Sequence, residues 1–168
     1  METINAMTSH TISIFVANKP GVLVRVSQVF ARRGFNIDSL VVSSGTDGRF
    51  SRMTVTSKGD GELIDQIIRQ VIKLVDVLHA VEHRGDEVVE KELALIKVAV
   101  SLDKRGEVLQ MVDHFKAVTV DFTEESLIIQ VTGGSDKLDA LIKMLERYGI
   151  LEIVRTGKVA MTRGRSET

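Results

Sequence analysis

The sequence contains no cysteine and no tryptophan, only one proline and one tyrosine, and no long apolar run. Without cysteine, the chain can form no disulfide, no thiolate nucleophile and no thiolate metal site. None of its apolar runs approaches the roughly 20 residues that a membrane-spanning helix needs. The first nine residues lack the basic and apolar regions of a signal peptide, and we expect them to form a frayed leader. These absences predict a cytoplasmic protein with no membrane partner.

A large excess of one charge is also lacking, because 22 basic and 23 acidic residues give a formal net charge of −1. Aromatic residues make up 4% of the chain, which leaves few rings on which nucleic-acid bases could stack. We therefore expect no nucleic-acid partner. The 168 residues, 43% of them hydrophobic, are enough to build one domain or two small ones.

The first half of the chain alternates between strand and helix patterns. Runs rich in β-branched residues, at 11–17, 35–43, 52–57 and 77–83, predict strands, the second and third joined by a turn at 44–48. Apolar residues at helical spacing predict helices over 20–33 and 61–75. The resulting order, βαββαβ, is the split βαβ of ferredoxin-like folds.

The second half repeats this order after a charged stretch. Strands are predicted at 93–102, 117–122, 127–131 and 150–155, and helices at 104–115 and from Ser135, which is expected to cap the helix, to Gly149. The fold class is therefore α+β, with two ferredoxin-like βαββαβ domains in tandem. We place the domains at residues 10–84 and 93–164, with a linker at 85–92.

The turn between the first strand and the first helix carries the main candidate site. Pro20 suits the first helical position, and Gly21 allows close approach to the backbone. The unpaired N–H groups of Gly21, Val22 and Leu23, beside the Asn18 amide, would form a small anion site suited to a carboxylate. In the alternative interpretation, Asn18 only caps the helix and the following residues only turn the chain.

The rest of the sequence offers little chemistry. Residues 103–106 of the second half lack a proline, so we expect the ligand site in the first half. No nucleophile with a base, phosphate loop or carboxylate pair is found, and no catalytic residue is predicted. His79 and His83 share one face of a strand, but Glu82 points to the other face, so an exposed or interface face is favoured over a metal site.

Two sets of motifs resemble known families. Residues 18–23 and 30–40 resemble an ACT domain, a ferredoxin-like module that binds small amino acids. Further stretches in the same order are similar to the regulatory, or small, subunit of acetolactate synthase, also called acetohydroxyacid synthase; they are residues 51–55, 73–77 and 157–164.

The resemblance implies a regulatory chain that does not itself catalyse. Its catalytic partner subunit would condense two pyruvates, or pyruvate with 2-oxobutyrate, in branched-chain amino-acid biosynthesis, using thiamine diphosphate, a metal ion such as Mg²⁺, and FAD. This chain would bind no cofactor and no metal; it would activate the partner and transmit feedback inhibition by valine. The family's valine site carries over to Asn18, Gly21, Val22, Leu23, Asn36 and Ile37.

The family also implies a homodimer through the ACT sheets, with residues 36–37 facing the turn at Asn18 of the other protomer. One alternative is a free-standing ACT amino-acid sensor that controls another enzyme or a regulator. Another is an acylphosphatase-like enzyme, which would need an arginine in its phosphate loop; Asn18 has only Lys19 and Pro20 as neighbours.

Overall fold

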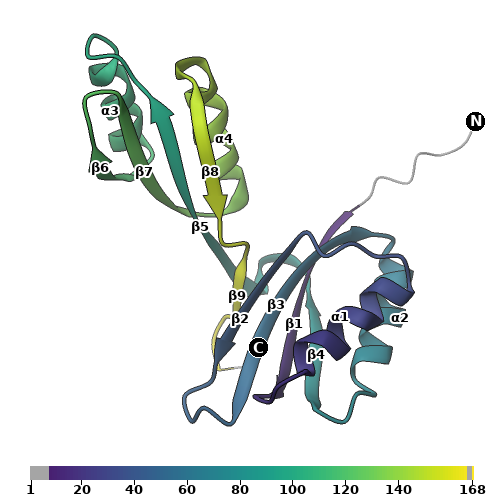
Figure 1. Cartoon of the computed structure of the whole chain (residues 1–168). Coiled ribbons are helices and arrows are strands. Elements are labelled where there is room, and N and C mark those ends of the chain that lie inside the picture. Colours follow the sequence, from purple (N-terminus) through teal and green to yellow (C-terminus); the bar gives the residue numbers. More distant parts are fainter. Residues whose placement is uncertain (1–7, 166–167) are drawn as a thin grey trace, which may run out of the picture. The chain divides into compact units, whose positions relative to one another are not determined.

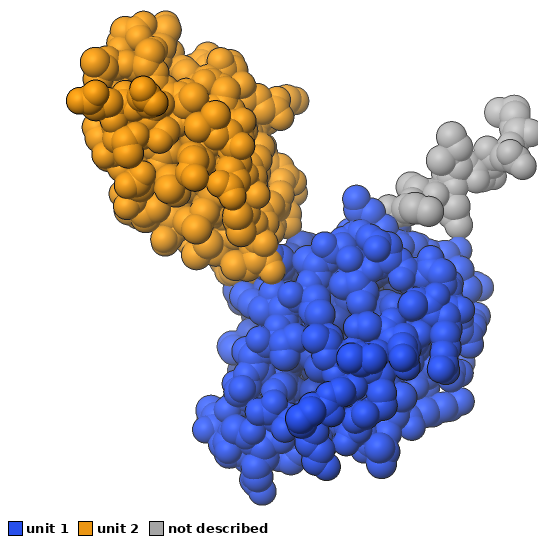
Figure 2. All heavy atoms as spheres, in the orientation of Figure 1, with its two compact units in different colours: residues 1–89, 157–168 blue, residues 90–156 orange. Residues whose placement is uncertain are grey.

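The computed structural model describes residues 8–165 and residue 168. The chain divides into two compact units, which Figure 2 colours separately: unit 1 comprises residues 1–89 and 157–168, and unit 2 comprises residues 90–156. The boundaries expected from the sequence had placed 157–164 in the second domain. The expected leader covers residues 1–7, which lie outside the described residues, and residues 8–9, which belong to the first strand.

Unit 1 contains a four-stranded antiparallel sheet with the strand order β2-β3-β1-β4. Its strands are β1 (Thr8–Ala17), β2 (Ser39–Ser44), β3 (Phe50–Gly59) and β4 (Val77–His83). Helices α1 (Val22–Arg32) and α2 (Gly61–Val71) cover one face of this sheet (Figure 1). The observed order is the predicted βαββαβ.

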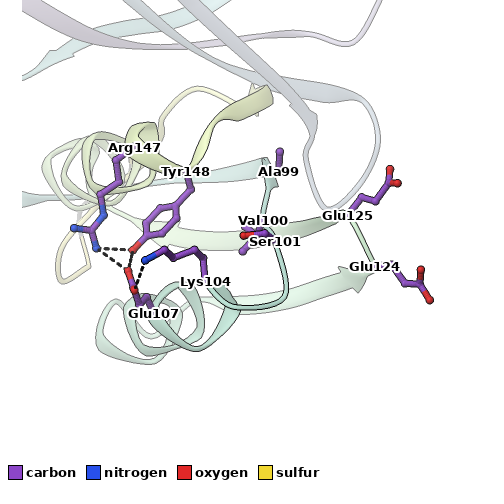
Figure 3. A pocket seen from close by; sticks show the side chains of 9 residues that line it. All are labelled: Ala99, Val100, Ser101, Lys104, Glu107, Glu124, Glu125, Arg147 and Tyr148. Atoms are coloured by element: carbon purple, nitrogen blue, oxygen red, sulfur yellow. Dashed lines mark hydrogen bonds and ion pairs between the residues drawn. The ribbon is translucent and has the colours of Figure 1, made fainter.

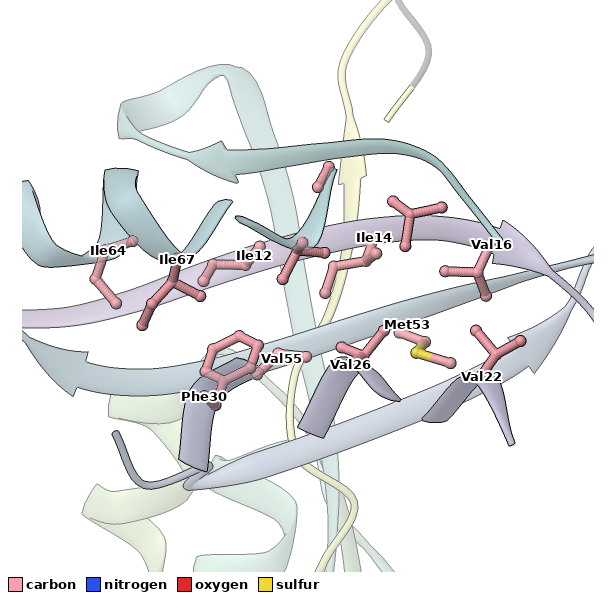
Figure 4. Close-up of a cluster of buried hydrophobic side chains, with 13 residues drawn as sticks. Ile12, Ile14, Val16, Val22, Val26, Phe30, Met53, Val55, Ile64 and Ile67 are labelled. Atoms are coloured by element: carbon pink, nitrogen blue, oxygen red, sulfur yellow. The ribbon is translucent and has the colours of Figure 1, made fainter. Parts of the chain in front are cut away.

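The core of unit 1 lies between the sheet and these helices (Figure 4). Alternate residues of β1 point inward, because successive side chains of a strand point to opposite faces. They meet the buried stripes of α1 and α2; fully or almost fully buried members include Ile12, Ile14, Val16, Val26, Phe30, Ile64 and Ile67. Burial of each such side chain contributes roughly 1.5–3 kcal/mol relative to exposure.

The other face of this sheet is polar but also buried in part. Thr11, Ser13 and Thr54 lie there and are almost inaccessible to solvent.

The C-terminal segment also belongs to unit 1, where Gly157 lies against Ser39 and Val41 of β2. The last strand, β9 (Val159–Thr162), pairs with β5 (Val88–Ala99). A segment far away in sequence therefore completes unit 1.

Unit 2 repeats the architecture. Its sheet order is β6-β7-β5-β8, antiparallel throughout, with β6 (Val118–Phe122), β7 (Ser126–Gly133) and β8 (Ile150–Arg155). Helices α3 (Arg105–His114) and α4 (Ser135–Leu145) pack on it, and the 3-10 turn η2 (Glu146–Tyr148) follows α4. Two ferredoxin-like domains in tandem are thus confirmed.

Several predicted boundaries were wrong. The linker expected at 85–92 is mostly ordered: the 3-10 turn η1 (Gly85–Glu87) leads directly into β5, which starts at Val88 rather than Leu93 and ends at Ala99. Strand β2 starts at Ser39 rather than Phe35. Residues 159–162, for which no strand was predicted, form β9.

Two helix predictions also need correction. Helix α2 ends at Val71, because the N–H groups of Lys73 and Leu74 bond to carbonyls three residues back. Val75, predicted to lie in the buried stripe, is 95% exposed. At the start of α4, the capping position is Gly134, and Ser135 is the first helical residue.

Candidate functional site

The turn between β1 and α1 differs from the predicted one in a specific way. Helix α1 begins at Val22, so Pro20 precedes the helix instead of opening it. Gly21 is the capping residue and has a φ of 82°, a left-handed backbone conformation in which side chains with a Cβ are strained. A glycine is needed here because of this backbone conformation.

Asn18 does not cap the helix, which excludes the alternative interpretation of this residue. Its side-chain amide donates to the Gly48 carbonyl at 2.9 Å, and its backbone N–H donates to the Arg49 carbonyl at 2.8 Å. Both acceptors lie in the turn between β2 and β3. Asn18 therefore ties the two turns at this end of the sheet together, and among the described residues its amide oxygen has no donor.

The three N–H groups proposed as an anion site are not equivalent. That of Val22 lies 3.4 Å from the Lys19 carbonyl, within the turn, while those of Gly21 and Leu23 have no partner among the described residues. The Val22 side chain is 2% exposed and belongs to the core, so only its backbone could meet a ligand. The Leu23 side chain is 40% exposed.

Asn36 and Ile37 lie beyond the opposite end of α1. The side-chain amide of Asn36 donates to Asp38 at 3.2 Å, and the backbone carbonyl of Asn36 accepts from the Ser57 hydroxyl at 2.7 Å. Ile37 packs against the core. The eleven residues of α1 extend over about 16 Å. One chain therefore does not bring Asn18 and Asn36 together.

A cluster of charged side chains that was not predicted from the sequence lies beside the turn. Arg25, the fourth residue of α1, forms an ion pair with Asp76, and the Lys19 ammonium lies 3.9 Å from the same carboxylate. The Asp76 carbonyl also accepts the Ala17 N–H at 2.8 Å. The sequence shows an acidic residue, Asp76, just before the strand at Val77. The spacing of apolar residues, however, does not reveal which distant side chain such a residue contacts.

A second polar cluster lies at the other end of β1. His10 faces Glu82 at 2.5 Å and the Gly59 carbonyl at 3.1 Å, and Arg84 pairs with both Glu82 and Asp65. Burial acts to raise the pKa of Glu82, but hydrogen bonds from Arg84 and His10 outweigh it and hold that pKa below its ordinary value of 4.5. These contacts link β1, β3 and β4, and the cluster therefore stabilises the sheet.

Unit 2 contains a cavity of about 710 Å³ (Figure 3). Within it, Glu107 accepts hydrogen bonds from the Tyr148 hydroxyl at 2.7 Å and from Lys104 at 3.2 Å, and the hydrogen bond from Tyr148 is the main reason why the pKa of Glu107 is lowered. Arg147 donates to the Tyr148 hydroxyl. The lining residues are Ala99, Val100, Ser101, Lys104, Glu107, Glu124, Glu125, Arg147 and Tyr148.

The two histidines of β4 do not form a ligand set. His83 bonds to the Ser13 hydroxyl at 2.7 Å, and His79 is exposed. Among residues 8–165 and 168, no group of three or more histidine, aspartate and glutamate side chains is placed to hold a metal ion. None of the helices described is both long and apolar enough to span a membrane.

Two family models match this chain. Residues 12–79 match the ACT domain of acetohydroxyacid synthase small subunits, and residues 91–164 match the model described as the small subunit of acetolactate synthase. The first match covers most of the described part of unit 1, including the turn at 18–21. The second includes all of β9.

Individual relatives agree with these matches. The chain is 45% identical over 160 residues to the acetolactate synthase small subunit of Mycolicibacterium smegmatis, covering 95% of this chain and 94% of the relative. It is 42% identical to that of Mycobacterium bovis, covering 93% of each chain. The crystal structure of the small subunit from Thermotoga maritima superimposes with a TM-score of 0.85 at 40% identity, covering 95% of this chain and all of that one. The chain therefore belongs to the acetolactate synthase small-subunit family, whose members are regulatory subunits of that enzyme.

Proposed function

We propose that this chain binds valine, or another branched-chain amino acid, at an ACT dimer interface, and that it thereby transmits feedback inhibition to the acetolactate synthase catalytic subunit. The observation that carries the proposal is the left-handed turn at Gly21, which lies within the residues matched by the ACT family model. It leaves the N–H groups of Gly21 and Leu23 open at the positive end of α1. A carboxylate is the ligand group that such a turn accepts.

The remaining contacts require a second copy of the chain. The Asn18 amide oxygen is an acceptor suited to an ammonium group, and Ile37 offers an apolar surface to a branched side chain. Because Asn18 and Asn36 lie at opposite ends of α1, one chain supplies only half of each site. A homodimer with two-fold symmetry would bring the two halves together twice.

The chain would act without cofactors of its own. Thiamine diphosphate, Mg²⁺ and FAD belong, in this proposal, to the catalytic subunit, which the small subunit activates in the cytoplasm. Valine must bind one arrangement of the complex more tightly than another, because a ligand with equal affinity for two states does not change the equilibrium between them.

Calorimetric titration of the purified chain with valine, leucine and isoleucine tests the proposal directly. We expect saturable binding of at least one of these amino acids, and a dimer by light scattering at micromolar concentration. Co-purification with the catalytic subunit separates this function from that of a free-standing sensor. Absence of binding for all three amino acids would refute the amino-acid site, and a monomer that binds valine would refute the shared site.

A further inference from the structure

Arg25 lies directly over the turn at Gly21. A Cβ atom added at Gly21 would lie 3.3 Å from Nη1 of Arg25. The guanidinium is held from the other side, because Nη2 donates to the Asp76 carboxylate. Nη1 has no partner among the described residues. A fixed cation therefore presents a free donor to the same turn that offers the Gly21 and Leu23 N–H groups.

The two units carry the same backbone framework around this turn. The Ala17 N–H donates to the Asp76 carbonyl, and in unit 2 the Ala99 N–H donates to the Gly149 carbonyl at 2.9 Å. One residue further along, the N–H of Asn18 and the N–H of Val100 each donate to the turn between the next two strands. Residues 17 and 18 therefore correspond to residues 99 and 100.

The same offset brings opposite charges to the first turn of each helix, at the fourth residue of α1 and the third residue of α3. It pairs the buried Val26 of α1 with the buried Val108 of α3, and it pairs Arg25 with Glu107. Arg25 forms an ion pair with an acid, Asp76, whereas Glu107 forms an ion pair with Lys104 and accepts a hydrogen bond from the Tyr148 hydroxyl. The cavity of unit 2 thus has a carboxylate where the turn of unit 1 has a guanidinium (Figure 3).

We propose that Arg25, positioned by Asp76, selects for a ligand carboxylate at the turn of unit 1, and that Glu107 prevents the equivalent turn of unit 2 from binding one. A guanidinium forms charge-assisted hydrogen bonds with carboxylates, which are stronger than those between neutral groups. In unit 2 the cations Lys104 and Arg147 are already paired with Glu107, so an entering carboxylate would have to compete for them with a like charge. This inference rests on the proposed function and names the group that recognises the acid end of the amino acid.

The experiment compares valine with valinamide, which has the same side chain and ammonium group but no carboxylate. Both are titrated calorimetrically into the full chain and into Arg25→Gln, Arg25→Lys and Asp76→Asn. We expect Arg25→Gln to bind valine about 10- to 100-fold more weakly and to lose most of the preference for valine over valinamide. Arg25→Lys, which keeps the charge, should retain part of that preference.

Asp76 is a positioning residue, so its removal has a different signature. Asp76→Asn should weaken valine binding by roughly three- to tenfold, because the guanidinium loses its anchor but keeps its charge. It should still prefer valine to valinamide. The matched control is Arg147→Gln in unit 2, which removes an exposed arginine and should leave both affinities unchanged.

Each result decides between the two proposals. If the unmodified chain binds valine and Arg25→Gln, folded by circular dichroism, binds it equally well, this inference is overturned while the proposed function stands. The same conclusion follows if Arg25→Gln keeps the full preference for valine over valinamide. If the unmodified chain binds no branched-chain amino acid, the proposed function fails and the inference fails with it.

Discussion

Gly157 lies so close to Ser39 that a Cβ atom at residue 157 would come within 2.6 Å of the serine Cβ. Gly157 also has a φ of 85°, so a larger residue would be strained by its backbone as well as by its neighbour. This contact joins a segment near residue 160 to β2 of unit 1, at a distance of more than 100 positions in sequence.

The first prediction concerns Gly157→Ala. Left-handed backbone costs about 1–3 kcal/mol for a residue with a Cβ, and the contact with Ser39 adds to this. We expect a lower free energy of unfolding in urea, with the loss confined to unit 1. The control is Gly164→Ala, which has a φ of 76° but no atom near its Cβ position. Equal losses for both variants would show that the Ser39 contact contributes nothing.

The second prediction is that Gly21→Asp abolishes valine binding while the chain remains folded. Aspartate tolerates the left-handed region better than most residues. Its carboxylate would lie beside Arg25 and repel the carboxylate of the ligand. Gly85→Asp places the same side chain on a left-handed glycine with open space around it and should bind valine normally. Unchanged affinity of a folded Gly21→Asp would argue against this turn as the site.

The third prediction concerns acid stability. Because the folded state lowers the pKa of Glu82, its stabilisation is complete above the ordinary pKa of 4.5 and is lost as the pH falls through the lowered value. Glu82→Gln should therefore reduce the free energy of unfolding by about 1–3 kcal/mol at pH 7, and by less as the pH falls below about 4.5. Urea unfolding at several pH values measures the difference.

Glu152→Gln is the control for this measurement, since the exposed Glu152 forms only a surface pair with Lys97 at 3.2 Å. Such pairs contribute about 0–1 kcal/mol. If the loss for Glu82→Gln stays constant down to pH 3, protonation of Glu82 does not explain it.

The fourth prediction separates the two units. Leu93 and Thr156 form hydrogen bonds to each other, the N–H of Thr156 donating to the Leu93 carbonyl at 3.0 Å. The segments by which the chain enters and leaves unit 2 are therefore neighbours at this point. A short Gly-Ser linker in place of residues 94–155 retains Leu93, Thr156 and the start of β5 beside β9, and should therefore keep unit 1 folded, dimeric and able to bind valine. A chain that ends at residue 90 lacks Gly157 and β9 and should unfold at a lower urea concentration.

Reconstitution with the catalytic subunit extends this test. We expect the chain without residues 94–155 to lose valine inhibition, because unit 2 is the element left to differ between the two arrangements of the complex. An inhibition curve identical to that of the full chain would exclude a role of unit 2 in feedback.

The sequence was sufficient to predict the fold because apolar periodicity is a local property. The positions of Ile12, Ile14 and Val16 on one strand, and of Val26 and Phe30 on one helix, specify which faces are buried. The repeated order of elements then specified two domains of one kind. These predictions needed no knowledge of which distant residues meet.

The errors arose where distant backbone contacts decide the structure. Residues 88–92 include three charged side chains and were predicted as part of a linker, but they extend β5, which pairs with β9 as well as with β7 and β8. Val75 continued the helical pattern, yet the helix had already ended at Val71. At the candidate site, the turn and Gly21 were predicted from local chemistry, whereas the pairing of Arg25 with Asp76 depends on β4 lying beside β1.

The contribution of residues 157–165 to unit 1 has a consequence during protein synthesis. A ribosome must translate all of residues 90–156 before it reaches Gly157 and β9. Domains generally fold as units during synthesis, starting from the N-terminus. Unit 2 can therefore complete its own sheet first. Until residues 157–165 are made, part of one sheet face of unit 1 stays uncovered. A chain that ends at residue 156 should therefore be more exposed to proteases in unit 1 than in unit 2.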